Sequence, residues 1–222
     1  MILLAIDTSG PLGSIALARC EAVDCVLLET HPLEGGNFSA QLVPEIAALL
    51  AKQGIEKKDI GGFAVASGPG SFTGLRVGLA AVKGLAEILE KPIAAVSLLE
   101  VVAVAAGAQG SVIALLDAGR RQAFAGNYEI ATDSAICKEE CLLLWEELAA
   151  YAASRTIVTP DKKVAEFLDS SRTEFVEIQR PLADAIARIG WRKLAAGLSS
   201  DVAELEANYI RRTDAEILLH GK

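Results

Sequence analysis

Residues 61–90 read GGFAVASGPGSFTGLRVGLAAVKGLAEILE, which predicts a strand, a glycine-rich turn and a long helix in direct succession. The unbroken apolar run at 63–66 is typical of a strand buried inside a mixed or parallel sheet. Gly and Pro at 68–70 mark the turn, and the helix ends near Pro92. A further strand is predicted at 93–96. This alternation of strand and helix indicates an α/β fold.

The predicted helix over 71–90 carries two apolar stripes. At about 100° per residue, one stripe holds Phe72, Leu75, Leu79, Val82, Ala86 and Leu89, and the other holds Val77, Ala81, Gly84 and Ile88. Gly74 and Gly78 lie between them and would allow another backbone to approach closely. The apolar arc is therefore about twice the ~100° that a helix on one core requires.

We interpret this surplus as a protein–protein interface that also includes the predicted helix over 39–52. An apolar helical interface of this kind is typical of a permanent complex. The residues assigned to it are Phe72, Leu75, Arg76, Leu79, Val82, Leu42 and Ile46. The alternative is a central helix enclosed within its own domain, and the sequence does not distinguish which stripe faces outward.

The second half of the chain repeats the plan of the first. Val112–Leu116 runs into Asp117 as Ile2–Ile6 runs into Asp7. We interpret this pattern as a duplicated βββαβαβα unit, with an N-terminal lobe over 1–106 and a C-terminal lobe over 107–222. The alternative is coincidence, because an apolar strand, an aspartate, a turn and a second strand are a common arrangement and the identity between the two halves is low. In the second lobe we expect strands at 156–158 and 175–178 and helices near 143–153, 161–168 and 182–196. No clear element is expected over 202–221.

Composition limits the classes of function. The net charge is −8 and the pI is near 4.9, so phosphate repulsion disfavours direct nucleic-acid binding, and RNA would be reached through a more basic partner. No basic stretch precedes the apolar start, and the apolar window 92–110 contains Glu100. We therefore expect neither a leader nor a membrane span. The four cysteines fit reduced thiols in a cytoplasmic protein.

Two aspartates are candidate cofactor-binding residues. Asp7 and Asp117 each end a strand at a turn, the position at which two-lobed ATPases hold a metal–phosphate group. The alternative is a carboxylate that caps its own turn. Residues 68–74 could similarly offer helix N–H groups to an anion. They lack the Gly-Lys-Ser/Thr of a Walker loop, so a tight turn with Ser71 or Gly70 as helix cap is favoured.

No constellation of catalytic or metal-binding residues is evident. His31 and His220 belong to no spaced pair, and Cys137 and Cys141 lack a third ligand nearby. Ser71 does not stand in a Gly-x-Ser-x-Gly nucleophile elbow. We therefore assign no catalytic residue and no metal site.

Several strings resemble one protein family. These are Ile6–Ser9, Ser67–Gly78 (SGPGSFTGLRVG), Lys83–Ala86 and Tyr209–Arg212. Together they are similar to the TsaB family, also called YeaZ, over the whole chain. The resemblance implies an actin-like, duplicated ribonuclease-H-like ATPase fold. It also implies participation in making threonylcarbamoyladenosine beside the tRNA anticodon.

The same resemblance implies the role and partners of the chain. TsaB-like proteins are non-catalytic partners of TsaD, whose His-x-x-x-His motif binds the metal; here residues 95–102 contain no histidine. We expect a scaffold or activator that pairs with a TsaD-like catalytic subunit and a TsaE-like ATPase. It would form a homodimer when alone and meet tRNA only through the complex. No cofactor is implied for this chain, and ATP or ADP at the subunit junction stays open.

Three positions depart from the family pattern, and two other functions stay open. Before the first helix, where the family often has His-Ser, this chain has Phe38-Ser39. At the start of the second lobe, the family's Asp-Ala-Arg is here Asp117-Ala118-Gly119-Arg120. The proline that usually precedes Tyr-Leu-Arg is absent, because Ala207-Asn208 precede Tyr209. These changes question a polar role for the cleft of the first lobe, but not the fold. The main alternative is an actin-like ATPase or small-molecule kinase that acts alone. A protease, an older label for this superfamily, lacks any nucleophile here.

Overall fold

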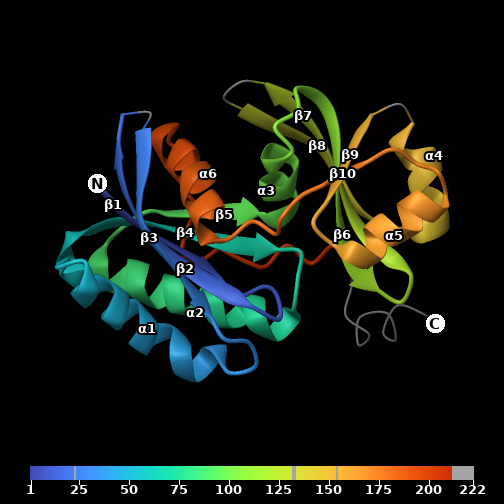
Figure 1. Cartoon of the computed structure of the whole chain (residues 1–222). Helices are drawn as coiled ribbons and strands as arrows, with labels where there is room; N and C mark the ends of the chain where they lie inside the picture. The colour runs from blue at the N-terminus through green and yellow to red at the C-terminus, as the bar shows by residue number, and fades with distance from the viewer. Residues whose placement is uncertain (23, 132–133, 154, 212–222) are drawn as a thin grey trace. The chain divides into compact units, whose positions relative to one another are not determined.

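The computed structural model describes residues 1–22, 24–131, 134–153 and 155–211, which form two compact units (Figure 1). Unit 1 comprises Met1–Val101 and Pro181–Ala207, and unit 2 comprises Val102–Arg180 and the described residues from Asn208 onward. The single boundary expected near residue 106 therefore differs from the structure, which assigns 181–207 to unit 1.

Unit 1 is built on a five-stranded mixed sheet in the order β3-β2-β1-β4-β5. Its strands are β1 (Ile2–Asp7), β2 (Gly13–Glu21), β3 (Asp24–Leu33), β4 (Ile60–Gly68) and β5 (Ile93–Ser97). β1 pairs antiparallel with β2 and parallel with β4, which pairs parallel with β5. The apolar run 63–66 is fully buried, as expected for a strand covered on both faces.

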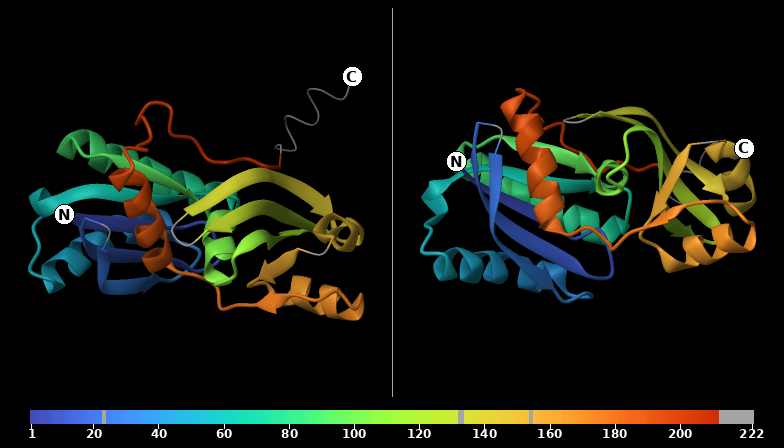
Figure 2. Two further views of the ribbon diagram at one scale, coloured as in Figure 1. Left: turned by 90° about the horizontal axis from the view of Figure 1, so that it is seen from above. Right: turned by 45° about the horizontal axis from the view of Figure 1, so that its top comes forward.

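Helices cover both faces of this sheet. α1 (Phe38–Lys52) and α2 (Phe72–Leu89) lie on one face and α6 (Ala183–Ala195) on the other (Figures 1 and 2). Gly190 of α6 sits so close to β4 that an added Cβ would lie 2.4 Å from the Cβ of Ala64. This close packing explains why the segment containing α6 belongs to unit 1.

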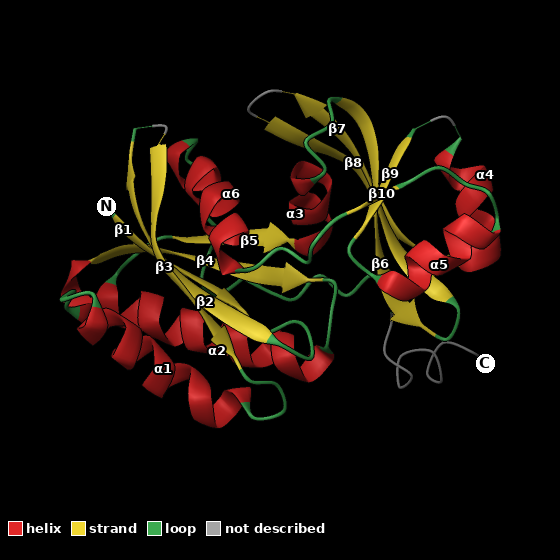
Figure 3. Cartoon of the chain, in the orientation of Figure 1, coloured by secondary structure: helices red, strands yellow, loops and turns green. Residues whose placement is uncertain are grey.

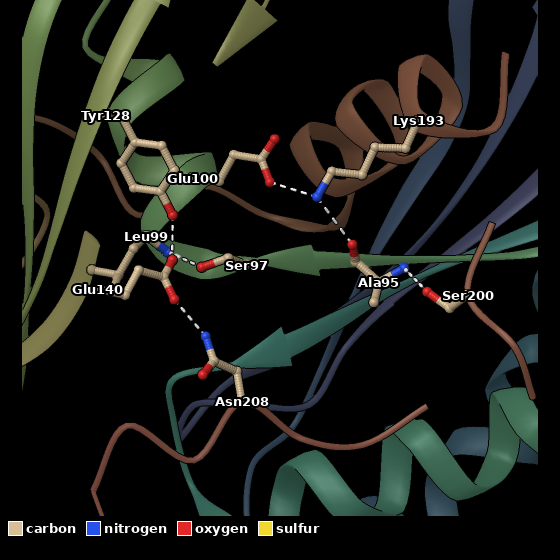
Figure 4. Close-up of polar contacts among 9 residues, drawn as sticks. All are labelled: Ala95, Ser97, Leu99, Glu100, Tyr128, Glu140, Lys193, Ser200 and Asn208. Carbon is tan, nitrogen blue, oxygen red and sulfur yellow. Dashed lines mark hydrogen bonds and ion pairs between the residues drawn. The ribbon is translucent and has the colours of Figure 1, made fainter. Parts of the chain in front are cut away.

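Polar contacts also tie α6 to unit 1. The Lys193 ammonium donates hydrogen bonds to Glu100 at 2.6 Å and to the Ala95 carbonyl at 3.1 Å (Figure 4). At the start of α6, the Ala183 N–H donates to Ser14 Oγ at 2.9 Å. Burying these groups requires partners of this kind, so the contacts fix the helix against the sheet.

Unit 2 repeats the sheet of unit 1. Its strands are β6 (Gly110–Gly119), β7 (Gln122–Ala131), β8 (Ser134–Leu144), β9 (Thr156–Thr159) and β10 (Val176–Glu177). The order β10-β9-β6-β7-β8 is that of unit 1 when strands are counted from the first in each unit. α4 (Leu148–Ala152) and α5 (Lys162–Ser170) accompany this sheet, and α3 (Leu98–Ala105) precedes it. The expected duplicated α/β fold is confirmed.

The elements of unit 2 differ from the prediction at one place. The predicted helix over 143–153 is shorter, because β8 continues to Leu144 and α4 spans only Leu148–Ala152 (Figure 3). β8 pairs along its length with β7, and this pairing offsets the weak strand preference of Lys138, Glu139 and Glu140. In the described part of the chain, no helix is both long and apolar enough to traverse a bilayer.

Candidate functional site

The turn after β1 is a buried polar segment. Asp7, Thr8 and Ser9 are 8 %, 2 % and 3 % exposed. Asp7 Oδ1 accepts the N–H of Ser9 at 2.8 Å, the bond of an Asx turn. The carboxylate of Asp7 thus caps its own turn, which is the alternative to cofactor binding that the sequence offered. Its role toward a nucleotide or metal stays a prediction.

The glycine-rich motif of residues 68–78 packs directly onto this turn. Ser71 N–H donates to the Ser9 carbonyl at 2.6 Å, and Thr8 Oγ1 donates to the Gly74 carbonyl at 2.7 Å. An added Cβ on Gly74 would lie 2.0 Å from the Thr8 carbonyl oxygen, and one on Gly78 would lie 2.5 Å from Thr8 Oγ1. The glycines are therefore needed for the close approach of α2 to the β1–β2 turn.

Ser71 is the N-cap of α2. Its Oγ accepts the Gly74 N–H at 3.3 Å. Two backbone N–H groups of this loop, those of Ser71 and Gly74, are thus engaged within unit 1. This geometry favours the interpretation of residues 68–74 as a tight, capped turn rather than as a phosphate-binding loop.

Asp117 occupies the matching turn of unit 2. Its Oδ1 accepts the Gly119 N–H at 2.8 Å, and its own N–H donates to Asp161 Oδ2 at 2.7 Å. Lys163 lies 4.0 Å from its second oxygen, and Arg180 forms an ion pair with Asp161. Both aspartates therefore form the same turn, each in its own unit. This symmetry follows from the duplicated fold.

The structure corrects most of the interface assignment. Leu42, Ile46, Leu75, Leu79 and Val82 are at most 5 % exposed, and all lie inside unit 1. The stripe that contains Leu75 faces the sheet, because α2 packs on β4 and these apolar side chains are removed from water there. These five residues cannot form an exposed surface of the folded chain, and the enclosed-helix alternative holds for them.

The opposite sides of α1 and α2 form the exposed surface, here called the outer face. It consists of Ala40, Val43 and Ala47 on α1 and Phe72, Arg76, Ala80, Gly84 and Ile88 on α2. Ile88 is 81 % exposed, Val43 58 % and Phe72 38 %. The Arg76 guanidinium carbon lies 3.7 Å from the centroid of the Phe72 ring. Two assigned interface residues, Phe72 and Arg76, are thus exposed, and the second stripe supplies Gly84 and Ile88.

Phe38, one of the departures from the family pattern, lies in the core. Its ring is so close to Gly13 that an added Cβ there would meet Phe38 Cε1 at 2.7 Å. His31, by contrast, lies on a partly exposed surface, where its Nε2 is 3.1 Å from a carboxylate oxygen of Glu45. Among the residues that the structure describes, no group of three or more His, Cys, Asp or Glu could hold a metal ion.

The late motif around Tyr209 contacts the sheet of unit 2. Asn208 donates a hydrogen bond to Glu140, which also accepts one from the buried Tyr128 hydroxyl (Figure 4). The Arg211 guanidinium hydrogen-bonds to Gln122. Arg212, the last residue of the motif, lies outside the described residues. The sequence offered no signal for Tyr128 and Glu140, because they meet Asn208 only through long-range packing.

Comparisons with known proteins agree with one another. The family model for TsaD, tRNA N6-adenosine threonylcarbamoyltransferase, matches residues 32–217. The chain is 39 % identical over 131 residues to the tRNA threonylcarbamoyladenosine biosynthesis protein TsaB of Bacillus subtilis, covering 58 % of this chain and 56 % of that protein. With Escherichia coli TsaB it shares 33 % identity over 132 residues, 58 % of this chain and 55 % of that protein.

A solved structure matches over nearly the full length. YeaZ from Pseudomonas aeruginosa superposes with a TM-score of 0.76 at 26 % identity, over 94 % of this chain and 99 % of that chain. By sequence, however, the chain spans just over half the length of the curated relatives it matches.

Proposed function

Because this chain belongs to the TsaD family and, within it, to the TsaB (YeaZ) group, we propose that it is a non-catalytic scaffold or activator subunit in threonylcarbamoyladenosine biosynthesis. In this role it pairs with a TsaD-like catalytic subunit and a TsaE-like ATPase in the cytoplasm. The complex transfers the threonylcarbamoyl group to adenosine beside the tRNA anticodon. The names of the TsaB relatives support the pathway.

The observation that carries the subunit role is the outer face of α1 and α2. Its exposed apolar members include Val43, Phe72 and Ile88, and small residues between them let a second helix approach closely. Desolvating such side chains against a partner is favourable by about 25 cal/mol per Å² buried. We propose that this face binds the catalytic subunit, and that a second copy covers it when the chain is alone.

The electrostatics support indirect contact with RNA. A chain of net charge −8 repels phosphates, so tRNA is bound by other members of the complex. The proposal requires no cofactor of this chain, and any ATP or ADP that the complex uses would bind at the subunit junction. The non-catalytic role is supported by residues 95–102, which carry no His-x-x-x-His pair.

Reconstitution tests this function. Purified TsaD-like and TsaE-like proteins, a supply of threonylcarbamoyl-adenylate and tRNA are assayed with and without this chain, and modification should depend on it. Equal modification without the chain would end the proposal.

Charge on the outer face should act specifically in the same assay. Ile88→Glu should lower binding of the catalytic subunit and modification together, because a partner would bury the new carboxylate. Leu198→Glu is the matched control, since Leu198 is 65 % exposed in unit 1 but lies outside α1 and α2. Unchanged binding by Ile88→Glu would remove the outer face from the proposal.

The alternative, an ATPase or small-molecule kinase acting alone, depends on the turns at Asp7 and Asp117. It requires that the isolated chain bind a nucleotide. Titration calorimetry with ATP and Mg²⁺ distinguishes the two functions. Measurable binding that Asp7→Asn abolishes would favour the enzyme, and its absence would favour the subunit.

A further inference from the structure

Cys20 and Cys25 stand directly opposite each other in the β2–β3 hairpin of unit 1. Side chains of directly opposed residues in an antiparallel pair project from the same face of the sheet. Cys20 is 1 % exposed and Cys25 is half-buried. The hairpin therefore holds two free thiols side by side, one enclosed and one partly accessible.

The hydrogen-bond pattern places this pair at a narrow site of the ladder. The Cys20 N–H donates to the Met1 carbonyl at 2.9 Å, and the Cys20 carbonyl accepts from the Met1 amino nitrogen at 2.8 Å. Both polar groups of Cys20 thus point away from β3, which makes Cys20 and Cys25 a non-hydrogen-bonded pair. Such pairs have Cα atoms about 4.5 Å apart, within the roughly 4.4–6.8 Å range of disulfides.

The surroundings give the two thiols different reactivity. The pKa of the Cys25 thiol is lowered by a hydrogen bond from Cys20 and by the charge of Arg188, although burial opposes the change. The same hydrogen bond and burial raise the pKa of the Cys20 thiol. Cys25 Sγ also lies 3.9 Å from the Ala187 carbonyl oxygen of α6. Cys25 is therefore the better nucleophile, because the thiolate is the reactive form.

We propose that Cys20 and Cys25 are an oxidation site at which a hydroperoxide forms a reversible cross-strand disulfide. The Cys25 thiolate attacks a peroxide oxygen, so that an S–O bond forms and the O–O bond breaks. The departing oxygen takes a proton and leaves as water or an alcohol. Cys20 sulfur then attacks Cys25 sulfur, the S–O bond breaks, and hydroxide leaves with the Cys20 proton as water. Two thiols lose two electrons, and one hydroperoxide is reduced.

This site is independent of the proposed tRNA role. Thiols of cytoplasmic proteins are normally kept reduced, and the disulfides that do form there are mainly transient or sensing. Reduction by a small thiol would return the pair to the resting state by exchange.

Peptide mapping of the full chain tests the proposal. Residues 20–52 contain no internal Lys or Arg and follow Arg19, so trypsin releases both cysteines in one peptide. After hydrogen peroxide and alkylation, this peptide should be two hydrogens lighter, carry no alkyl group, and recover both thiols on reduction. Cys137 and Cys141, which fall in separate peptides, serve as internal controls that remain alkylated. A peptide 20–52 that keeps two alkylatable thiols would overturn the proposal.

Single variants test the assigned order of attack. In Cys20→Ser the sulfenic acid on Cys25 should persist and be trapped by dimedone, whereas in Cys25→Ser the enclosed Cys20 should remain unlabelled. Equal labelling of the two variants would contradict the order. Thermal melts establish whether each variant folds. If a variant does not fold, the peptide mapping of the unsubstituted chain still tests whether the disulfide forms.

Discussion

Gly74→Ala should destabilise the protein, although alanine is normally the better helix residue. The new Cβ would lie 2.0 Å from the Thr8 carbonyl oxygen, whereas ordinary contact begins at 3.4 Å, so backbone must move by more than an ångström. Overpacking of this kind costs about 1–3 kcal/mol. Loss of the Thr8–Gly74 hydrogen bond adds about 1 kcal/mol. A helix-propensity gain of up to ~1 kcal/mol offsets part of this, which leaves a net loss of about 1–3 kcal/mol.

Gly84→Ala on the same helix should have the opposite sign. An added Cβ at Gly84 meets no atom within 4 Å, so only the helix-propensity gain of about 0.5–1 kcal/mol remains. Thermal melts of the full chain, followed by circular dichroism, measure both. At roughly 2–4 °C per kcal/mol for a chain of this size, Gly74→Ala should melt earlier and Gly84→Ala later. Equal shifts of one sign would show that the close approach of α2 to Thr8 is not real.

Three further predictions concern unit 1. Leu79→Ala should cost about 2–5 kcal/mol in a urea titration because Leu79 is 5 % exposed, whereas Ile88→Ala should stay within about 0.5 kcal/mol. Ser71→Ala should cost about 0.5–2 kcal/mol by loss of the α2 cap, and Ser71→Asp should restore most of it. The Lys52 hydrogen bond holds the Glu29 pKa below its usual value. Lys52→Met should therefore reduce stability at neutral pH, and unfolding at several pH values should show the difference vanishing as acid protonates Glu29.

The elements nearest residues 61–90 were predictable because the local signals agree. The apolar run 63–66, the turn at 68–70 and the stop at Pro92 each specify one boundary without any distant partner. The repeat of an apolar strand ending at Asp7 and at Asp117 predicted the duplicated sheet for the same reason. The helix predicted over 143–153 began too early, because Leu143 and Leu144 are the last residues of β8 and pair there with β7.

The candidate site was predictable in chemistry but not in orientation. The sequence identified two apolar stripes on α2, because the 3.6-residue period of a helix places residues three and four apart on the same side. Which stripe meets the sheet depends on how α2 is rotated about its axis, and Leu75, Leu79 and Val82 prove to be the buried one. The rotation is set by Gly74 and Gly78, which must face Thr8.

Local pattern, read along the chain, thus specified the α/β class, the duplication and the turns at Asp7 and Asp117, since these depend on residues near one another. Packing between distant segments settled two other matters, the return of 181–207 to unit 1 and the identity of the outer face. The meeting of Cys20 with Cys25 is local in sequence, but it depends on the register of the β2–β3 hairpin. Each of these requires two distant segments, or two strands in one register, to come together. The free energy of such a contact depends on both surfaces together, so it cannot be predicted from the sequence of either segment by itself.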